Sequence, residues 1–227
     1  MPPEPPSVPD PDESGREIEW QLAAEDLAPV RRWLIAHPGV AGLDIVPAHP
    51  QRLQDTYLDT DDWRVFRAGF ALRVRERDTE WEATLKSLHS ARTDLADRQE
   101  MTEALSDGPP ALARACGPVG VRVREMIGTA PLRRLFRAET RRERFRVRRP
   151  GQAHDAAEIA LDETSLLASD GTHLEHLRRV EVEAVGGPLE PLAALVEVLR
   201  IACGLRRPTE NKFAAGLRAA GRAAPRA

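Results

Sequence analysis

The sequence predicts a mainly β protein in which antiparallel strands curl into a barrel and a few helices pack outside it. Apolar and charged residues alternate at period two in many segments, as in "EIEWQL" at residues 17–22, and this alternation is typical of a half-buried strand. Few segments show helical spacing, and the predicted strands are of similar length. Like charges also gather on the same strand instead of alternating in sign. This favours a sheet whose charged faces lie opposite a counter-charge, because neighbouring like charges destabilise a sheet.

Each predicted strand is a short segment with alternating side chains. The strands cover residues 16–22, 43–46, 52–60, 70–77, 80–88, 96–105, 138–148, 157–169 and 177–185. The segments 70–77 and 80–88 form a hairpin about the polar turn between them.

Helices are predicted where apolar residues recur at helical spacing, or where Pro, Gly or an N-cap residue marks an end. They cover residues 24–37, 109–117, 188–204 and 208–221. The third has Pro near its start and Gly at its end, and Thr209 is the candidate N-cap of the last.

One domain is expected, over residues 15–217. Residues 1–14 are rich in Pro and acidic residues and predict a disordered tail. Residues 218–227, rich in Ala and Arg, predict a flexible C-terminal tail.

Composition excludes several classes of protein. A net charge of −3 argues against binding to duplex nucleic acid, which needs a basic surface. No apolar run reaches the ~18 residues of a membrane span and no signal sequence begins the chain, so a cytoplasmic protein without membrane contact is expected. Cys116 and Cys203 are expected to be buried, reduced thiols.

The charged strand faces raise the question of where they point. Paired acids occur at Glu17/Glu19 and Glu181/Glu183, and paired bases at Arg73/Arg75 and Arg142/Arg144. Members of a pair lie roughly 6.5–7 Å apart on a strand, where two like charges repel by about 2.5 kcal/mol at an effective dielectric constant of about 20. The faces either lie in solvent, which is the common arrangement for an antiparallel sheet, or turn inward onto counter-charges.

An inward arrangement has a definite chemistry. Carboxylates bind hard divalent cations, and guanidinium and ammonium groups bind phosphates. In a barrel both sets would meet in one lumen, and the apolar faces would look outward beneath helices. Trp20 and Trp81 lie on apolar faces and are expected in the core, and the pair His173 and His176 is expected to bind no metal because no second ligand cluster accompanies it.

The order of these segments resembles the CYTH superfamily, the triphosphate tunnel metalloenzymes. The resemblance rests on "EIEWQL", "YLDT", "FALRVRER", "WEATLKS", "RQEMTEAL", "TRRERF", "AEIALDE", "RRVEVEAVGG" and "TENKFAAGL", and it covers residues 16–217. It implies an eight-stranded antiparallel tunnel that binds an inorganic or organic triphosphate with Mg²⁺ or Mn²⁺.

The resemblance also implies residue roles. The catalytic residues it implies are Glu17, Glu19, Gln21 and Lys86. The substrate-binding residues it implies are Arg73, Arg75, Lys86, Arg98, Arg142, Arg144 and Lys212. The metal ligands it implies are Glu17, Glu19, Glu100, Glu158, Asp162, Glu181 and Glu183. Arg141 competes with Arg142, because a slip of one residue exchanges the two faces of a strand.

Two positions depart from the family pattern. Gln21 stands where the first strand normally carries a lysine thought to position or activate the attacking water, and Thr140 stands where many members have a basic residue. Gln carries no charge and cannot act as a base.

The expected function is metal-dependent hydrolysis of a triphosphate, with inorganic triphosphate favoured because no nucleoside or thiamine pocket is evident. A class IV-like adenylate cyclase, a thiamine triphosphatase and a non-catalytic module that binds polyphosphate or a nucleotide stay open, as does a homodimer.

Overall fold

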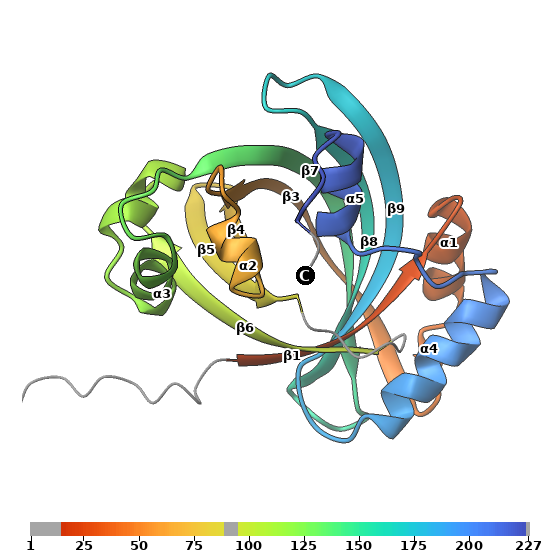
Figure 1. Ribbon diagram of the computed structural model, residues 1–227. Helices are drawn as coiled ribbons and strands as arrows, with labels where there is room; N and C mark the ends of the chain where they lie inside the picture. Colours follow the sequence, from red (N-terminus) through yellow and green to blue (C-terminus); the bar gives the residue numbers. More distant parts are fainter. Residues whose placement is uncertain (1–14, 89–94, 226–227) are drawn as a thin grey trace, which may run out of the picture.

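The backbone forms a closed barrel. The computed structural model describes residues 15–88 and 95–225, and in these ranges nine antiparallel strands form one sheet in the order β2-β3-β4-β5-β6-β1-β9-β8-β7. Because β3 also pairs with β7, eight strands close on themselves and β2 remains outside the barrel (Figure 1). The predicted eight-stranded antiparallel barrel with flanking helices is confirmed.

The strands and helices follow the predicted order with different limits. The strands are β1 Gly15–Ala23, β2 Gly39–Val40, β3 Leu43–Asp59, β4 Phe70–Arg77, β5 Glu80–Ser87, β6 Leu95–Leu105, β7 Arg133–Arg148, β8 Asp155–Leu167 and β9 His173–Ala184. The helices are α1 Ala28–Ala36, α2 Arg64–Arg67, the 3₁₀-helix η2 Pro109–Arg114, α3 Pro118–Ile127, α4 Glu190–Ala202 and α5 Lys212–Ala219. The predicted tail at 1–14 lies outside the described residues, and residues 218 and 219 belong to α5.

Strand β3 is a single strand where two were predicted. Its 17 residues pair along β7, with a register shift between Ala48 and Gln51. Pro47 and Pro50 lie at or beside this shift, where a missing backbone donor is tolerated. The prolines therefore bend the strand and do not end it.

Helix α3 was not predicted from the sequence. Val119, Val121 and Val123 alternate at period two, which hides the helical period. The carboxylate of Glu103 on β6 accepts hydrogen bonds from the backbone N–H groups of Gly117 and Gly120, at 2.6 and 2.7 Å. A partner distant in sequence thus satisfies the first turn of the helix.

Two local predictions were wrong, and a third was right in kind but too long. The N-cap of α5 is Asn211, whose side chain accepts a hydrogen bond from the Ala214 N–H, and not Thr209. The short helix predicted over 109–117 is the 3₁₀-helix η2, which ends at Arg114. Cys116 is exposed and Cys203 is half-buried, although both are free thiols as expected.

The apolar strand faces point outward and are covered by helices. One core cluster lies between β1, β7, β8 and β9 and the helices α1 and α4, and includes Trp20, Ile159, Val182 and Leu195. A second lies on the opposite side of the barrel between β4, β5, η2 and α3, where half-buried Trp81 packs against it. Both tryptophans are core residues, as predicted, and the inside-out arrangement leaves the inner strand faces polar.

A third cluster closes one end of the lumen. Tyr57, Ala71 and Phe136 from the strands pack against Phe213 and Leu217 of α5. The rings of Tyr57 and Phe136 stack with centroids 4.5 Å apart. Helix α5 therefore acts as an apolar plug, and the charged part of the lumen lies beyond it.

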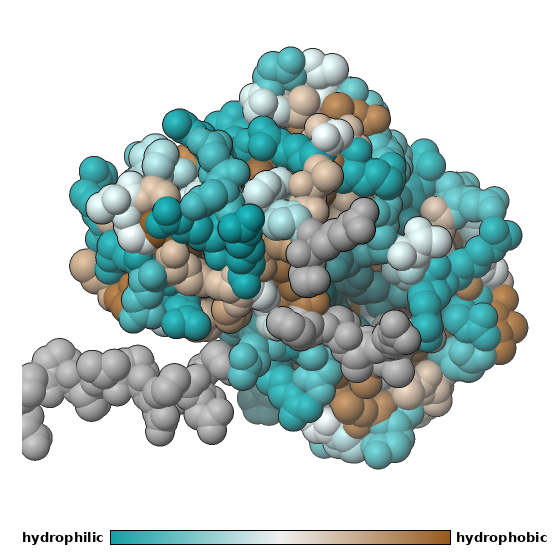
Figure 2. All heavy atoms as spheres, in the orientation of Figure 1, coloured by the Kyte–Doolittle hydropathy of each residue, from teal (hydrophilic) through white to brown (hydrophobic). Residues whose placement is uncertain are grey.

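The outer surface is mostly hydrophilic in the face that Figure 2 shows, with apolar residues in small separate groups. Within the described ranges, no helix combines the length and apolar character that crossing a bilayer requires.

Candidate functional site: the charged tunnel

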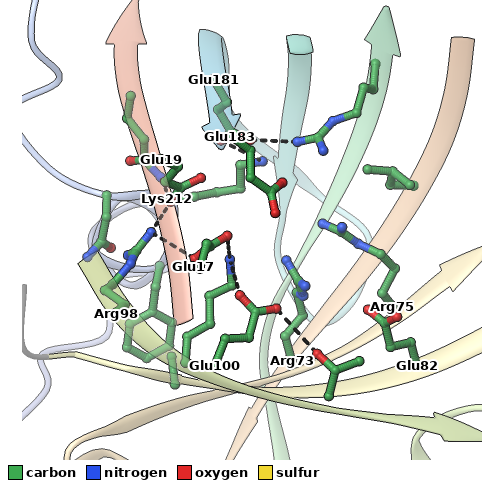
Figure 3. A pocket seen from close by; sticks show the side chains of 18 of the residues that line it. Glu17, Glu19, Arg73, Arg75, Glu82, Arg98, Glu100, Glu181, Glu183 and Lys212 are labelled. Atoms are coloured by element: carbon green, nitrogen blue, oxygen red, sulfur yellow. Dashed lines mark hydrogen bonds and ion pairs between the residues drawn. The ribbon is translucent and has the colours of Figure 1, made fainter. Parts of the chain in front are cut away.

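A cavity of about 440 Å³ occupies the lumen of the barrel. Its cationic lining residues are Arg73, Arg75, Arg77, Lys86, Arg98, Arg142, Arg144 and Lys212. Its acidic lining residues are Glu17, Glu19, Glu82, Glu100, Glu158, Glu181 and Glu183. These side chains come from strands distant in sequence and, for Lys212, from helix α5. The side chains that Figure 3 labels point toward one another, so the charged faces turn inward and not into solvent.

The two arginines of β4 are held by Asp55, a buried residue of β3. Arg75 donates two hydrogen bonds to its carboxylate at 2.7 and 2.9 Å, and Arg73 Nε lies 4.0 Å from it. Burial favours a higher pKa for Asp55, but the charges of Arg75 and Arg73 outweigh it and lower the pKa. Asp55 was not identified from the sequence. Strand alternation places it on the same face as Leu53 and Tyr57, which line the cavity, so it could have been found once that face was known to point inward.

Arg142 and Lys212 share a second buried acid, Asp162 of β8. Arg142 donates to both Asp162 oxygens at 2.7 Å, and Lys212 Nζ lies 3.2 Å from Oδ2. Arg142 also donates to Glu181 at 2.6 Å. Asp162 is fully buried and is not among the residues that line the cavity, so the structure places this predicted metal ligand behind the cations.

Contacts of β7 show which of its two faces lines the tunnel. Phe145 and Val147 point outward into the core beneath α1 and α4. Arg142 and Arg144, on the other face, line the cavity, whereas Arg141 is exposed on the outside of the barrel. Of the two arginines left open by the sequence, Arg142 is the one that faces the tunnel.

Lys86 of β5 lies between two carboxylates. Its Nζ is 2.6 Å from Glu17 and 3.0 Å from Glu100. Burial favours a lower pKa for Lys86, but the charges of Glu19, Glu17 and Glu100 outweigh it and the pKa is raised. Lys86 is therefore a permanent cation in the tunnel and not a proton acceptor.

Glu19 of β1 is held from two sides. Arg98 of β6 donates to its Oε1, and Gln21 Nε2 donates to the same oxygen at 2.6 Å. Burial raises the pKa of Glu19, and the negative charges of Glu181 and Glu17 add to this. Gln21, which replaces the family lysine, therefore orients a carboxylate of the site.

Three carboxylates lie in a row across the sheet, because Glu19 of β1 is opposite Glu183 of β9, which is opposite Glu158 of β8. Like charges directly opposite one another destabilise a sheet. Glu158 is neutralised by Arg144, whose Nε donates at 2.9 Å. Glu183 has no hydrogen bond or ion pair to any described residue. The residue is exposed at the edge of the cavity. Partial burial of its carboxylate among the lining side chains, and next the charge of Glu17, raise its pKa to about 7.

This local excess of negative charge fits a divalent cation. Glu17 Oε2 is buried without a hydrogen-bond partner, beside Glu19 and Glu183. In the described ranges, no group of three or more His, Cys, Asp or Glu side chains is already arranged around a single point as metal ligands. Carboxylate oxygens are nevertheless the donors that hard cations prefer.

Several lining residues were not predicted. Glu82 of β5 is opposite Arg75 in the strand register, and Arg77, Gln51 and Tyr57 also line the cavity. They follow from strand alternation once the inward face is known. His176 lies outside the barrel, where its Nε2 is 3.2 Å from Glu163, and His173 is exposed.

A closed antiparallel barrel with apolar faces outside and facing cations and carboxylates inside defines a barrel protein with a charged tunnel. The CYTH domain model matches residues 30–217, and the chain belongs to the CYTH family. A comparison with curated proteins found no match.

Solved structures with a similar fold include two that match most of this chain. HpAC1 from Hippeastrum, described as a putative adenylyl cyclase with a dominant triphosphatase activity, has a TM-score of 0.64 at 18% identity, over 92% of this chain and 98% of that one. A putative adenylate cyclase from Bacillus halodurans has a TM-score of 0.58 at 22% identity, over 88% of this chain and 98% of its own. These likenesses establish the fold of the chain.

Proposed function

We propose that the protein hydrolyses a triphosphate, with inorganic triphosphate as the preferred substrate and Mg²⁺ or Mn²⁺ as cofactor. The observation that carries this proposal is the convergence of basic and acidic side chains in one cavity of about 440 Å³. The basic residues are Arg73, Arg75, Lys86, Arg142 and Lys212. Beside them, Glu17 Oε2 is buried without a hydrogen-bond partner, and Glu183 has no partner among the described residues. Guanidinium and ammonium groups are the side chains that bind phosphate oxygens.

The cations are held in place before substrate binds. Asp55 orients Arg75, and Asp162 orients Arg142 and Lys212. Preorganised charges stabilise a transition state without the cost of reorganisation. In this proposal these cations neutralise the charge that develops on the transferred phosphoryl group.

Glu17, Glu19 and Glu183 are the residues that would hold the metal. Glu100, Glu158 and Glu181 are paired with Lys86, Arg144 and Arg142, and in this proposal they position those cations. Glu17 and Glu19 also have cationic partners, Lys86 and Arg98. They are assigned to the metal because they adjoin Glu183, which has no partner among the described residues. A bound divalent ion supplies charge neutralisation on phosphate oxygens and lowers the pKa of a bound water.

The aromatic residues of the cavity favour a substrate without a base. Among the described residues, the cavity lining includes Tyr57 and Phe213 as its aromatic side chains, and these are only 6% and 8% exposed. Both are packed in the plug with Phe136. A nucleobase would therefore find no free ring to stack on inside the tunnel.

The test is phosphate release from inorganic triphosphate, thiamine triphosphate and ATP with Mg²⁺, Mn²⁺ or chelator. Release from inorganic triphosphate that requires the metal supports the proposal. Formation of cyclic AMP would point to the cyclase, release from thiamine triphosphate alone to that hydrolase, and binding without turnover to a non-catalytic module. Arg141→Ala is the matched control for Arg142→Ala, because it removes the neighbouring arginine on the outer face.

A further inference from the structure

A row of arginines on β7 continues beyond the residues that line the cavity. Arg142, Arg144, Arg146 and Arg148 share one face of the strand, because the residues between them, such as Phe145 and Val147, point into the outer core. Alternate residues are roughly 6.5 Å apart, so the row spans roughly 20 Å. The first two arginines line the cavity, and Arg146 is the next one outward.

Arg146 differs from the other three in having no acidic partner. Arg142 pairs with Asp162, Arg144 with Glu158, and Arg148 with Asp155. Arg146 makes no hydrogen bond or ion pair with any described residue, and its Nε is buried without a partner. A buried donor left unsatisfied costs free energy unless a ligand or water satisfies it.

The surroundings explain why Arg146 remains free. Glu158 is opposite Arg146 in the register of β7 and β8, but its carboxylate is taken by Arg144. On the other side, β3 places Val46 opposite Arg146 and Ala48 opposite Arg144, and neither can accept a hydrogen bond through its side chain. An anionic ligand that leaves the cavity along β7 therefore meets an unneutralised guanidinium.

We propose that Arg146 extends the phosphate-binding site beyond three phosphates, so that the tunnel accepts a linear inorganic polyphosphate longer than triphosphate. This inference rests on the proposed function, since it assumes that the cavity holds phosphates. The apolar plug of Tyr57 and Phe213 closes the opposite end. The chain would therefore enter by the mouth at Glu183 and Val185, with its end in the tunnel and its remaining phosphates along β7.

The experiment measures the dissociation constants of triphosphate, tetraphosphate and a medium-chain linear polyphosphate by calorimetry, with chelator in place of divalent metal so that no hydrolysis occurs, and at fixed ionic strength. We expect Arg146→Gln to weaken binding of the longest chain roughly tenfold, the loss of a charge-assisted contact, and of triphosphate by less than threefold. Arg146→Lys should restore part of the loss. Arg141→Gln, on the outer face, should leave all three constants unchanged.

The inference is overturned if wild-type protein binds all three chains equally well, or if Arg146→Gln weakens triphosphate as much as the longest chain. Tighter, Arg146-dependent binding of a 5′-triphosphorylated oligonucleotide would overturn the assignment to polyphosphate. Failure of the proposed function is a separate result: it is absence of metal-dependent phosphate release from triphosphate, measured on the same preparations.

Discussion

The carboxylate of Asp55 accepts two hydrogen bonds from the Arg75 guanidinium, at 2.7 and 2.9 Å. Asp55 itself is only 1% exposed. The acid is on β3 and the base on β4, directly opposite in the strand register. This bidentate pair fixes an arginine that lines the tunnel and ties the site to the stability of the barrel.

Asp55→Asn should therefore damage both stability and function. Removing one partner of a buried pair leaves an uncompensated charge, which costs about 3 kcal/mol of unfolding free energy. Chemical denaturation measures that loss, and triphosphate affinity should fall because Arg75 is released. Asp61→Asn is the control, since the Asp61 side chain is 77% exposed; an equal effect of both substitutions would contradict the role given to Asp55.

Arg142→Ala and Arg141→Ala should have very different effects. Loss of Arg142 removes a positioned cation and leaves Asp162 and Glu181 without their main partner, so kcat/KM for triphosphate should fall roughly a hundredfold. Loss of the exposed Arg141 should change it by less than about twofold. Similar losses in the two variants would mean that β7 presents its other face to the substrate.

Gln21→Ala should weaken metal binding more than it weakens folding. The substitution removes the donor at 2.6 Å from Glu19, and one lost hydrogen bond to a charged group corresponds to about ten- to a hundredfold in affinity. Titration with Mn²⁺ measures the change directly. A Gln21→Ala protein with unaltered metal affinity would show that Arg98 alone positions Glu19.

The metal-free protein should become less stable as pH rises from about 4.5 to about 7. The pKa of Glu183 is raised in the folded state from 4.5 to about 7, so the folded protein binds more protons than the unfolded chain in this window, and stability falls as pH rises. Melting temperatures at several pH values, with and without Mg²⁺, test this.

Two comparisons isolate the Glu183 carboxylate. Glu183→Gln should flatten the decline in melting temperature, and Mg²⁺ should offset it above pH 7 by neutralising the ionised group. If the metal-free protein is equally stable across this range, Glu183 has an ordinary pKa and the metal assignment loses its electrostatic basis.

The strand alternation in the sequence predicted a curled sheet or barrel and which residues share its polar faces, but left open whether those faces point inward. Period two placed Glu17, Arg73 and Lys86 on polar faces, and in each case that face lines the tunnel. The family resemblance added the strand count and the choice of roles. Local signals failed at α3, whose valines alternate as in a strand, and at β3, whose prolines suggested a break.

What the sequence determined by itself is which residues share a strand face, because backbone geometry alternates side chains regardless of context. The tertiary structure decided which acid meets which base. Asp55 with Arg75, and Asp162 with Arg142, are pairs formed by register across strands, and register depends on the closure of the whole barrel. The tertiary structure also decided which charges have no partner among the described residues. Because Glu183 and Arg146 have none, they are the residues proposed to bind a metal and a phosphate.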